Sequence, residues 1–408
     1  MPESRMRVLV LHAQYTTRLS YYDDWLDAFH AAPAFDVRAV NIVAGGAQAE
    51  VRDGLANADA VVLLHSTNGD TTLYIEPFAP LLAERKIPLM SFVGNEVNLP
   101  GSPISDKRRF FAAIRPEFVA TQLLHEAGDY LFGDLVTNRV VAIPHGLNPA
   151  AFRPTQALDT RPIDIGARLV KYIAHLGDDD RNRLSDKFTA LGREGRLVVD
   201  ISDTRYDRAG WASFLNQCKG TASTEAGSWF IERDDATVNA IRARVLSEAR
   251  GIVIANDSPL RRIGHMMPWW MRAVLRRMLG SGVVRHEALV NESLDKDEIH
   301  QTFFAGKPRA PAYGKCISSR HFDAIGTKTC QIMFRGRFND ILEADRHYIA
   351  LEEDFANLDE VLDRFADLSV RTAIVEEAYA LAQSRHTYEH RMREVYDVFA
   401  GTQRPAAG

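Results

Sequence analysis

Short runs of apolar residues alternate with amphipathic helical stretches throughout residues 1–154. RVLVLH at 7–12 and AVVLLH at 60–65 are the clearest apolar runs. Strands that are apolar on both faces are typical of a parallel sheet covered by helices on both sides. The alternation therefore predicts a Rossmann-like, doubly wound α/β domain. The predicted strands are 7–12, 35–43, 60–65, 87–93, 117–120 and 139–143, and the predicted helices are 21–32, 48–56, 75–85 and 122–132.

The same alternation begins again after a polar, proline-bounded stretch at 153–161. It predicts a second Rossmann-like domain over 155–385, interrupted by an irregular insertion at about 236–312. A last helix at 386–399 follows, with an apolar stripe at helical spacing. The predicted strands are 163–167, 196–201, 329–334 and 348–351, and the predicted helices are 181–191, 210–218, 319–326, 358–368 and 370–384.

Composition narrows the function classes. The chain has 408 residues, 46% of them hydrophobic and 25% charged, which suits two globular domains. A net charge of -5 gives no electrostatic reason to expect a nucleic-acid partner. Three cysteines without a C-x-x-C pair predict neither a disulfide framework nor a zinc site. Such an odd, sparse set suits a reducing cytoplasm, where we expect the protein. No apolar run approaches the ~20 residues of a membrane span, so we expect no membrane-spanning helix.

Ligands of open α/β sheets bind beyond the carboxyl ends of the strands, so two such domains would share a cleft. IPHGLN at 143–148 ends a strand there, and its glycine permits close backbone approach. SSRHFDA at 318–324 opens a helix with Ser319 as the expected N-cap. The helix start and Arg320 would suit a diphosphate, and Asp323 would suit a ribose diol. The alternative is an ordinary capped helix.

Two further loops follow predicted strands of the second domain. DIGAR at 164–168 brings Arg168 to the cleft, with Lys171 just beyond, and cations there would stabilise a leaving diphosphate. Solvated surface charge is the alternative. TASTEAGS at 221–228 surrounds Glu225 with small residues that let backbone N–H groups approach a ligand. By itself this second loop is a weak signal.

Polar side chains also follow the strands of the first domain. Glu96, in FVGNEVNLPGSP, is the preferred candidate for a group near an acceptor hydroxyl, because a partly desolvated carboxylate can act as a base. His145 is the alternative catalytic group. Structural polarity remains the competing interpretation for each of them.

Two segments carry a family resemblance. IPHGLNPAAFRP resembles the interdomain IPNGVDxxxFxP segment of GT-B glycosyltransferases, glycosyl transferases group 1, and DAIGTKTCQI resembles their E-A-x-A-x-G-T-P-x-x segment. Residues 318–362 look more particularly like the CgeB-like branch related to spore maturation. The resemblance implies a nucleotide-sugar donor on the second domain and an acceptor on the first. It also implies that helix 386–399 packs back on the first domain.

By the same resemblance, Asp323 contacts the donor ribose, and Arg168 and Lys171 contact the diphosphate. The sequence departs from the family pattern at three places. Asp323 replaces a glutamate, Ala167 splits the usual G-R pair, and Lys315 occupies the place of the first glutamate of E-x7-E. Glu225 would supply that carboxylate if the insertion separates two halves of one motif.

The expected function is transfer of a hexose-type sugar from a nucleoside diphosphate to a hydroxyl acceptor. The resemblance implies a saccharide or glycolipid acceptor from cell-surface polysaccharide assembly. We expect no metal, because no D-x-D follows a strand in the cleft loops, and no cofactor besides the donor. Two alternatives use the same frame: a nucleotide-sugar epimerase or hydrolase, and a non-catalytic nucleotide-sugar-binding partner subunit.

The segment 261–279 of the insertion interleaves arginines with Trp269, Trp270 and other apolar residues at helical spacing. This pattern suits a helix at the interface of an anionic membrane, which would place the protein peripherally on the inner face of the plasma membrane. It equally suits a helix packed on its own domain, with the arginine heads reaching solvent.

Overall fold

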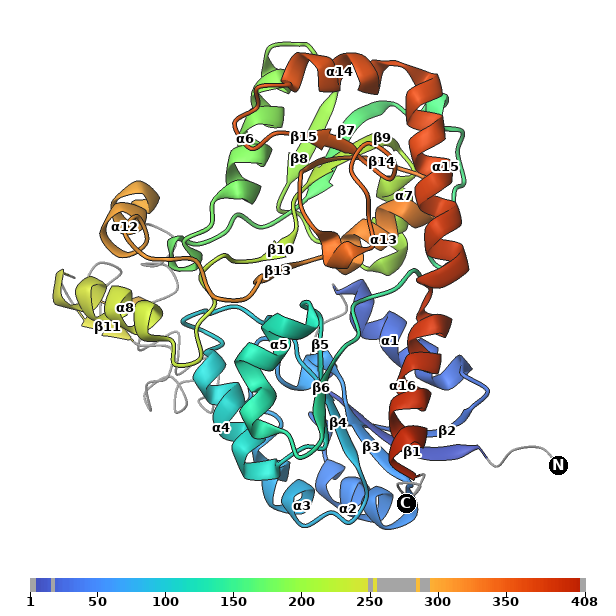
Figure 1. Cartoon of the computed structure of the whole chain (residues 1–408), viewed down its shortest axis with the longest axis vertical. Helices are drawn as coiled ribbons and strands as arrows, with labels where there is room; N and C mark the ends of the chain where they lie inside the picture. Colours follow the sequence, from blue (N-terminus) through green and yellow to red (C-terminus); the bar gives the residue numbers. More distant parts are fainter. Residues whose placement is uncertain (1–4, 16–18, 249–251, 255–283, 287–293, 404–408) are drawn as a thin grey trace.

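The computed structural model describes residues 5–15, 19–248, 252–254, 284–286 and 294–403. Two lobes, each built on a parallel sheet, lie one above the other in Figure 1, and an insertion projects from one side. The predicted α/β class with two parallel sheets is confirmed. Among the described residues, no helix combines the length and apolarity needed to cross a membrane.

The first lobe contains a six-stranded parallel sheet in the order β2-β1-β3-β4-β5-β6. Its central strands are buried along their whole length, which explains their uninterrupted apolar sequences. The strands are β1 (Met6–His12), β2 (Phe35–Asn41), β3 (Ala60–Leu63), β4 (Leu89–Phe92), β5 (Phe118–Thr121) and β6 (Arg139–Ala142). The helices between them are α1 (Ser20–Ala31), α2 (Ala47–Asn57), α3 (Ala79–Ala83), α4 (Ile104–Ile114) and α5 (His125–Phe132).

The second lobe contains a five-stranded parallel sheet in the order β15-β14-β9-β7-β8. Its strands are β7 (Ile163–Arg168), β8 (Val199–Ser202), β9 (Cys218–Ser223), β14 (Cys330–Phe334) and β15 (Ile349–Leu351). Its helices are α6 (Asp180–Arg193), α7 (Arg208–Leu215), α13 (Ser319–Gly326), α14 (Leu358–Ala366) and α15 (Leu368–Arg385). The predicted helix 210–218 is wrong at its end, because Cys218 is the first residue of β9.

The last helix, α16 (Tyr388–Gln403), leaves the second lobe and runs beside α1 of the first (Figure 1). Its buried side chains join Trp25, Phe29 and Phe118 in one apolar core on that face of the first sheet. Burial of this stripe ties the end of the chain to the first lobe. The residues of the stripe are Tyr388, Met392, Val395 and Phe399.

The chain crosses between the lobes twice, and the two crossings lie side by side. The Leu147 N–H donates to the His386 carbonyl at 2.7 Å, and the Tyr388 N–H donates to the Leu147 carbonyl at 3.0 Å. A Cβ at Gly146 would lie 2.9 Å from the backbone of Thr387. The close approach that this glycine allows is therefore to the second crossing of the chain.

The insertion leaves and re-enters the second lobe at one place. Strand β10 (Ala226–Gly227) pairs antiparallel with β13 (Lys315–Cys316). The segments that flank the insertion are therefore spatial neighbours. This proximity is required if the insertion separates two halves of one motif, one with Glu225 and the other with Lys315. The elements within it are α8 (Ala236–Glu248), the parallel pair β11 (Ile252–Ile254) and β12 (Val284–His286), and α12 (Lys296–Phe303). The predicted Trp269–Trp270 helix lies outside the described residues.

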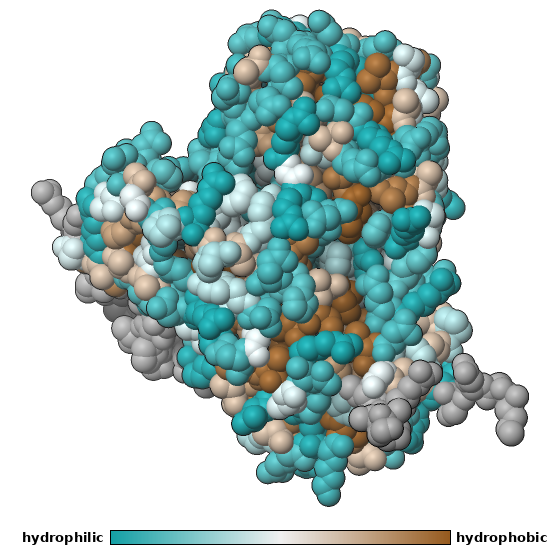
Figure 2. All heavy atoms as spheres, viewed as in Figure 1, coloured by the Kyte–Doolittle hydropathy of each residue, from teal (hydrophilic) through white to brown (hydrophobic). Residues whose placement is uncertain are grey.

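The start of the insertion docks on the first lobe. The Asp235 carboxylate accepts hydrogen bonds from the Ile104 N–H at 3.2 Å, the Ser105 N–H at 2.7 Å and the Asn98 amide at 2.6 Å. It thereby caps α4 from the other lobe, where Pro103 offers no side-chain cap. The insertion is thus a second tie between the lobes, apart from the two crossings. Figure 2 shows that most of this face is hydrophilic, with apolar side chains between the polar ones in both lobes.

Candidate functional site

A cleft of about 480 Å³ lies between the lobes and is lined from both of them. The first lobe contributes loops that follow β4 and β6, including Glu96 and His145. The second lobe contributes loops that follow β7 and β8 and the start of α13. Both sets of loops follow strands, which is where ligands of such sheets bind. Of the predicted site residues, Glu96, His145, Arg168, Lys171, Ser319 and Arg320 line the cleft.

Three arginines line the second-lobe side of the cleft without an acidic partner. Arg181 lies in the first turn of α6, Arg320 lies in the first turn of α13, and Arg205 lies in the loop after β8. No carboxylate of the described chain lies within ion-pair distance of any of them. Desolvation in the cleft, together with the positive charges of Arg181 and Arg205, lowers the pKa of Arg320 to about 10. We call these three residues the arginine cluster.

The starts of α6 and α13 make this clustering costly in the ligand-free protein. The positive end of a helix dipole lies at the N-terminus, so Arg181 and Arg320 are placed against it. Their like charges also repel one another. A bound anion would relieve both effects, since it would accept hydrogen bonds from the guanidinium groups and sit at two helix N-termini.

The start of α13 differs from its prediction by one residue. Ser318 is the N-cap, and its N–H donates to Nδ1 of His321 at 2.9 Å, so the prediction of Ser319 as the cap is wrong. Ser319 is instead the first helical residue and lines the cleft. This shift keeps Arg320 in the first turn.

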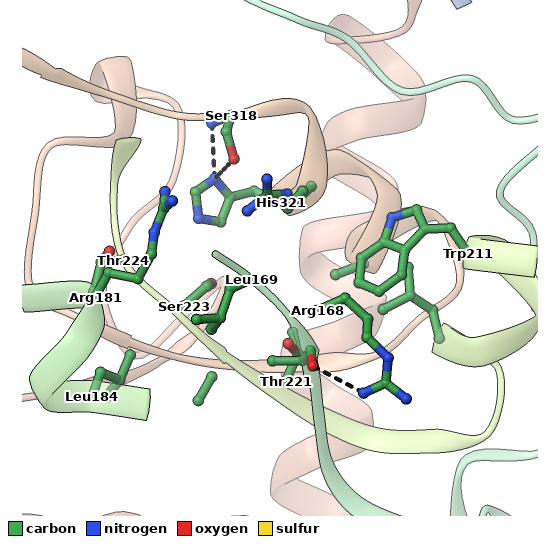
Figure 3. A pocket seen from close by; sticks show the side chains of 15 residues that line it. Arg168, Leu169, Arg181, Leu184, Trp211, Thr221, Ser223, Thr224, Ser318 and His321 are labelled. Carbon is green, nitrogen blue, oxygen red and sulfur yellow. Dashed lines mark hydrogen bonds between the residues drawn. The ribbon is translucent and has the colours of Figure 1, made fainter. Parts of the chain in front are cut away.

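A smaller cavity of about 40 Å³ continues from the cleft toward β7 and β9 (Figure 3). Arg181 enters it from α6, Ser318 and His321 lie at the start of α13, and Trp211 closes another side. The Ser223 hydroxyl is buried in its wall and has no hydrogen-bond partner within the described ranges. An unpaired buried hydroxyl is costly, so this cavity suits a polar ligand group.

Arg168 and Lys171 line the cleft but already have acidic partners. Arg168 makes two hydrogen bonds of 2.8 Å to the Asp200 carboxylate, and its guanidinium lies 3.8 Å from the centre of the Phe214 ring. Lys171 pairs with Asp186 at 2.5 Å on an exposed surface. Their positive charges are therefore largely neutralised, in contrast to those of the arginine cluster.

Asp323 lies just behind the cleft wall. Its carboxylate accepts a hydrogen bond from the Trp211 indole N–H at 2.9 Å. Burial, followed by the negative charge of Asp24, raises the pKa of Asp323 well above its ordinary value. Trp211 lines the cleft, whereas Asp323 does not. The ribose contact of Asp323 therefore stays a prediction.

Glu225 is not part of the cleft lining. Its carboxylate accepts hydrogen bonds from the Tyr313 hydroxyl and from the Phe338 N–H, the latter at 2.7 Å. Burial raises its pKa. In this structure the side chain holds the loop at 336–338 and does not face the cleft, so its predicted catalytic role has no geometric support here.

Lys315, which replaces the first glutamate of the family pattern, forms a buried ion cluster. Its ammonium lies 2.7 Å from Asp178 and 2.5 Å from Asp180. These partners neutralise it next to the start of α6, where Arg181 follows. Lys315 therefore anchors β13 to the start of α6, and it leaves the arginine cluster as the charge available to a ligand.

Glu96 is held rigidly at the first-lobe side of the cleft. Its carboxylate accepts hydrogen bonds from the Thr121 hydroxyl at 2.5 Å and the Gln122 N–H at 2.7 Å. The ammonium of the buried Lys107 donates to the carbonyls of Gly94 and Asn95, which directly precede it. Burial raises the pKa of Glu96 to about 7, although these groups favour its charged form. A carboxyl with such a pKa can exchange protons near neutral pH.

His145 lies deep in the same wall. Its Nδ1 accepts a hydrogen bond from the Trp25 indole N–H at 3.1 Å, and the His65 ring stacks on it with the centroids 5.2 Å apart. Burial lowers the pKa of His145 to about 3, and the positive charge of Arg391 lowers it further. The imidazole is therefore neutral under ordinary conditions.

Sequence reasoning missed two members of the arginine cluster. Arg181 begins the predicted helix 181–191, and Arg205 follows the predicted strand 196–201. A signal was present for both, since the start of a helix and a loop after a strand of the second domain both point toward the cleft. Only the tertiary structure, in which neither arginine has an acidic partner, distinguishes these two residues from solvated surface charges.

The architecture of this chain is similar to that of solved glycosyltransferase-type structures. An alpha-glucosyltransferase solved with UDP and a 13-mer DNA superposes with a TM-score of 0.54 at 9% identity, covering 97% of this chain and 100% of that one. Sucrose-phosphate synthase from Thermosynechococcus elongatus superposes with a TM-score of 0.50 at 10% identity, covering 98% and 99%. The chain has the GT-B fold.

Sequence comparison adds a finding for the C-terminal part of the chain. Residues 282–397 match the family described as Glycosyl transferase-like. The resemblance to GT-B glycosyltransferases of group 1 is thus confirmed, while the narrower resemblance to the CgeB-like branch stays a prediction. No curated protein matches the chain in sequence.

Proposed function

We propose that the protein is a glycosyltransferase that moves a sugar from a nucleoside diphosphate to the hydroxyl group of an acceptor. The observation that carries this proposal is the arginine cluster of Arg181, Arg205 and Arg320, which lines the cleft of a GT-B fold without acidic partners. Charged donors of this kind bind phosphate oxygens strongly, and guanidinium groups do so in a bidentate manner.

In the proposed reaction, the bond between the sugar C1 and the diphosphate oxygen breaks, and the diphosphate keeps the bonding electrons. A nucleoside diphosphate leaves with one more negative charge than it carries in the donor. Three guanidinium groups at two helix starts would stabilise that developing charge without a metal. The unpaired hydroxyl of Ser223 in the adjoining cavity would accept or donate a hydrogen bond to the nucleoside.

On the acceptor side, we propose that Glu96 takes the hydroxyl proton as the new C1–O bond forms. Its raised pKa and its place in the cleft support this role. The carboxylate cannot rotate easily, because Thr121 and Gln122 hold both of its oxygens. A fixed base is efficient only for a hydroxyl group presented at one position, which favours an acceptor with a defined shape.

We further propose a hexose as the transferred group and a saccharide or glycolipid of cell-surface polysaccharide assembly as the acceptor, in the cytoplasm. The family resemblance of residues 143–154 and 318–362 supports this choice, and the size of the cleft is compatible with a sugar beside a nucleotide. Because one protein of similar fold was solved with UDP, UDP is the first nucleotide to test.

The experiment is a thermal-shift screen with UDP, GDP, ADP and dTDP, followed by turnover of the matching nucleotide sugars over a panel of saccharide acceptors. A ligand that binds only the folded state raises the melting temperature according to its affinity. We expect one nucleotide to stabilise the protein in the screen. In the turnover assay, the matching nucleotide sugar should release its nucleoside diphosphate only when an acceptor is present. Release without an acceptor would indicate a hydrolase, and no stabilisation by any nucleotide would contradict the proposal.

A further inference from the structure

The surroundings of His145 determine which of its ring nitrogens carries a hydrogen atom. The Trp25 indole N–H lies 3.1 Å from Nδ1, and both side chains are buried. An indole nitrogen can only donate a hydrogen bond. Nδ1 must therefore be the acceptor, and in a neutral imidazole the hydrogen atom then resides on Nε2.

Two rings and one cation pack around the buried His145, and its burial and the positive charge of Arg391 oppose protonation of the imidazole. The His65 ring stacks on it at 24°, the Tyr21 ring lies 4.8 Å away, and Arg391 of α16 donates to the His145 carbonyl at 3.2 Å. Within the described ranges, no carboxylate is hydrogen-bonded to the imidazole. A histidine that serves as a base usually has an acidic group that stabilises its cation, and His145 lacks one.

The second ring nitrogen of His145, Nε2, differs from Nδ1 in its hydrogen bonding. It has no hydrogen-bond partner in the described chain, and His145, although buried, belongs to the cleft lining. The positive charge of Arg320 acts on the neighbouring Tyr21 hydroxyl, so the arginine cluster faces this part of the wall. A sugar attached to a diphosphate held by the cluster would lie between the two.

We propose that Trp25 is a positioning residue that fixes His145 as the Nε2–H tautomer, so that His145 donates a hydrogen bond to a sugar oxygen in the cleft. In this role His145 does not take the proton of the acceptor. The assignment of the oxygen to a sugar rests on the proposed function, whereas the tautomer does not. The oxygen belongs either to the transferred sugar or to the acceptor, and the kinetic test below distinguishes them.

The tautomer is measured on the substrate-free full-length protein by 15N NMR of labelled histidine side chains. The spectrum of His145→Gln identifies the His145 signals by their loss. We expect a protonated Nε2 and an unprotonated Nδ1 at neutral pH. A protonated Nδ1, or a doubly protonated ring, would overturn the proposal whether or not the protein proves to be a glycosyltransferase.

The variant Trp25→Phe keeps an aromatic ring but removes the N–H donor. We expect the His145 signals to change to a mixture of tautomers, and the turnover number to fall about tenfold, as for the loss of one well-placed hydrogen bond. Trp229→Phe, which lies outside the cleft lining, is the matched control and should change neither. Lost turnover with an unchanged tautomer would refute the positioning role.

His145→Gln and His145→Ala identify the oxygen and remain informative if Trp25→Phe does not fold. The amide of Gln supplies an N–H donor, so His145→Gln should retain more activity than His145→Ala. A rise in the donor KM alone would place the oxygen on the transferred sugar, and a rise in the acceptor KM alone would place it on the acceptor. Equal activity of the two variants would contradict the proposal that His145 donates a hydrogen bond to the substrate.

Discussion

The two walls of the cleft use polar residues in opposite ways. On the first-lobe wall, Glu96 receives two hydrogen bonds from its own lobe, and Asp70 receives one from Tyr15 and one from Asn95. On the second-lobe wall, the arginine cluster has no acidic partner in the described part of the chain. The carboxylates of the first wall are held in place before any substrate arrives, whereas the arginine cluster of the second wall has no ion-pair partner in the described chain.

This difference indicates which wall should tolerate change. A preorganised carboxylate acts on one proton at one position, so its removal should affect the chemical step. An arginine cluster acts on a multivalent anion through several contacts, so the loss of one member should weaken binding without abolishing it. Three substitutions and one pH dependence test that contrast.

The largest effect is expected for Glu96→Gln. The change preserves shape but removes the proposed base, so kcat/KM should fall by about 100-fold or more, the range for general base catalysis. The measurement is initial-rate kinetics with the nucleotide sugar found in the screen. Glu50→Gln on the exposed surface of α2 is the control. Unchanged kcat/KM would remove Glu96 from the mechanism.

The pH dependence of the wild-type protein sharpens this test. Burial raises the pKa of Glu96 from 4.5 to about 7, so activity that needs its ionised form should rise through pH 7. Stability should move the other way. A raised folded-state pKa stabilises the protein below pH 4.5, and that contribution is lost as the pH rises through 7. Glu96→Gln should remove both trends, and their persistence would contradict the assignment.

An intermediate effect is expected for Arg320→Ala. Hydrogen bonds to charged groups contribute about 1.5–3 kcal/mol, so the UDP dissociation constant should rise by about 10–100-fold. Arg320→Lys, which keeps the charge but not the planar fork, should fall between wild type and alanine. Calorimetric titration measures all three proteins. Arg196→Ala, which breaks an exposed ion pair with Asp359 outside the cleft lining, should match wild type.

The smallest effect is expected for Lys171→Ala. Its ammonium is already paired with Asp186 on an exposed surface, and such pairs contribute about 0–1 kcal/mol. The UDP dissociation constant should therefore change by less than about fivefold. A loss of UDP affinity as large as that of Arg320→Ala would indicate that the diphosphate binds to Arg168 and Lys171, as the family resemblance implies.

The sequence predicted the sheets well because parallel strands buried on both faces leave continuous apolar runs. It did not predict α4, although Phe110, Phe111 and Ile114 are buried there. A charged run from Asp106 to Arg109 interrupts the apolar spacing of α4, and its first turn depends on a cap from Asp235, more than a hundred residues away. Such a long-range cap leaves no local signal.

The candidate site was likewise predicted only in part. Glu96, His145 and Arg320 were found because each follows a strand or opens a helix that the pattern identifies. Arg168 was predicted on that basis, whereas Arg181 was not considered as a site residue. What separates them is Asp200 on the neighbouring strand β8, which neutralises Arg168. The pairing of charges depends on tertiary structure, so one sequence alone could not decide it.

The proposed contact between the arginine cluster and the donor diphosphate is tested by calorimetric titration of the protein with UDP and with uridine. The wild-type protein should bind UDP far more tightly than uridine, because only UDP carries phosphates. In the variant Arg181→Ala/Arg205→Ala/Arg320→Ala, the affinity for UDP should fall to that for uridine, while Arg168→Ala/Lys171→Ala should keep most of the difference. If the triple variant still prefers UDP as strongly as wild type does, the diphosphate lies elsewhere and the account is wrong.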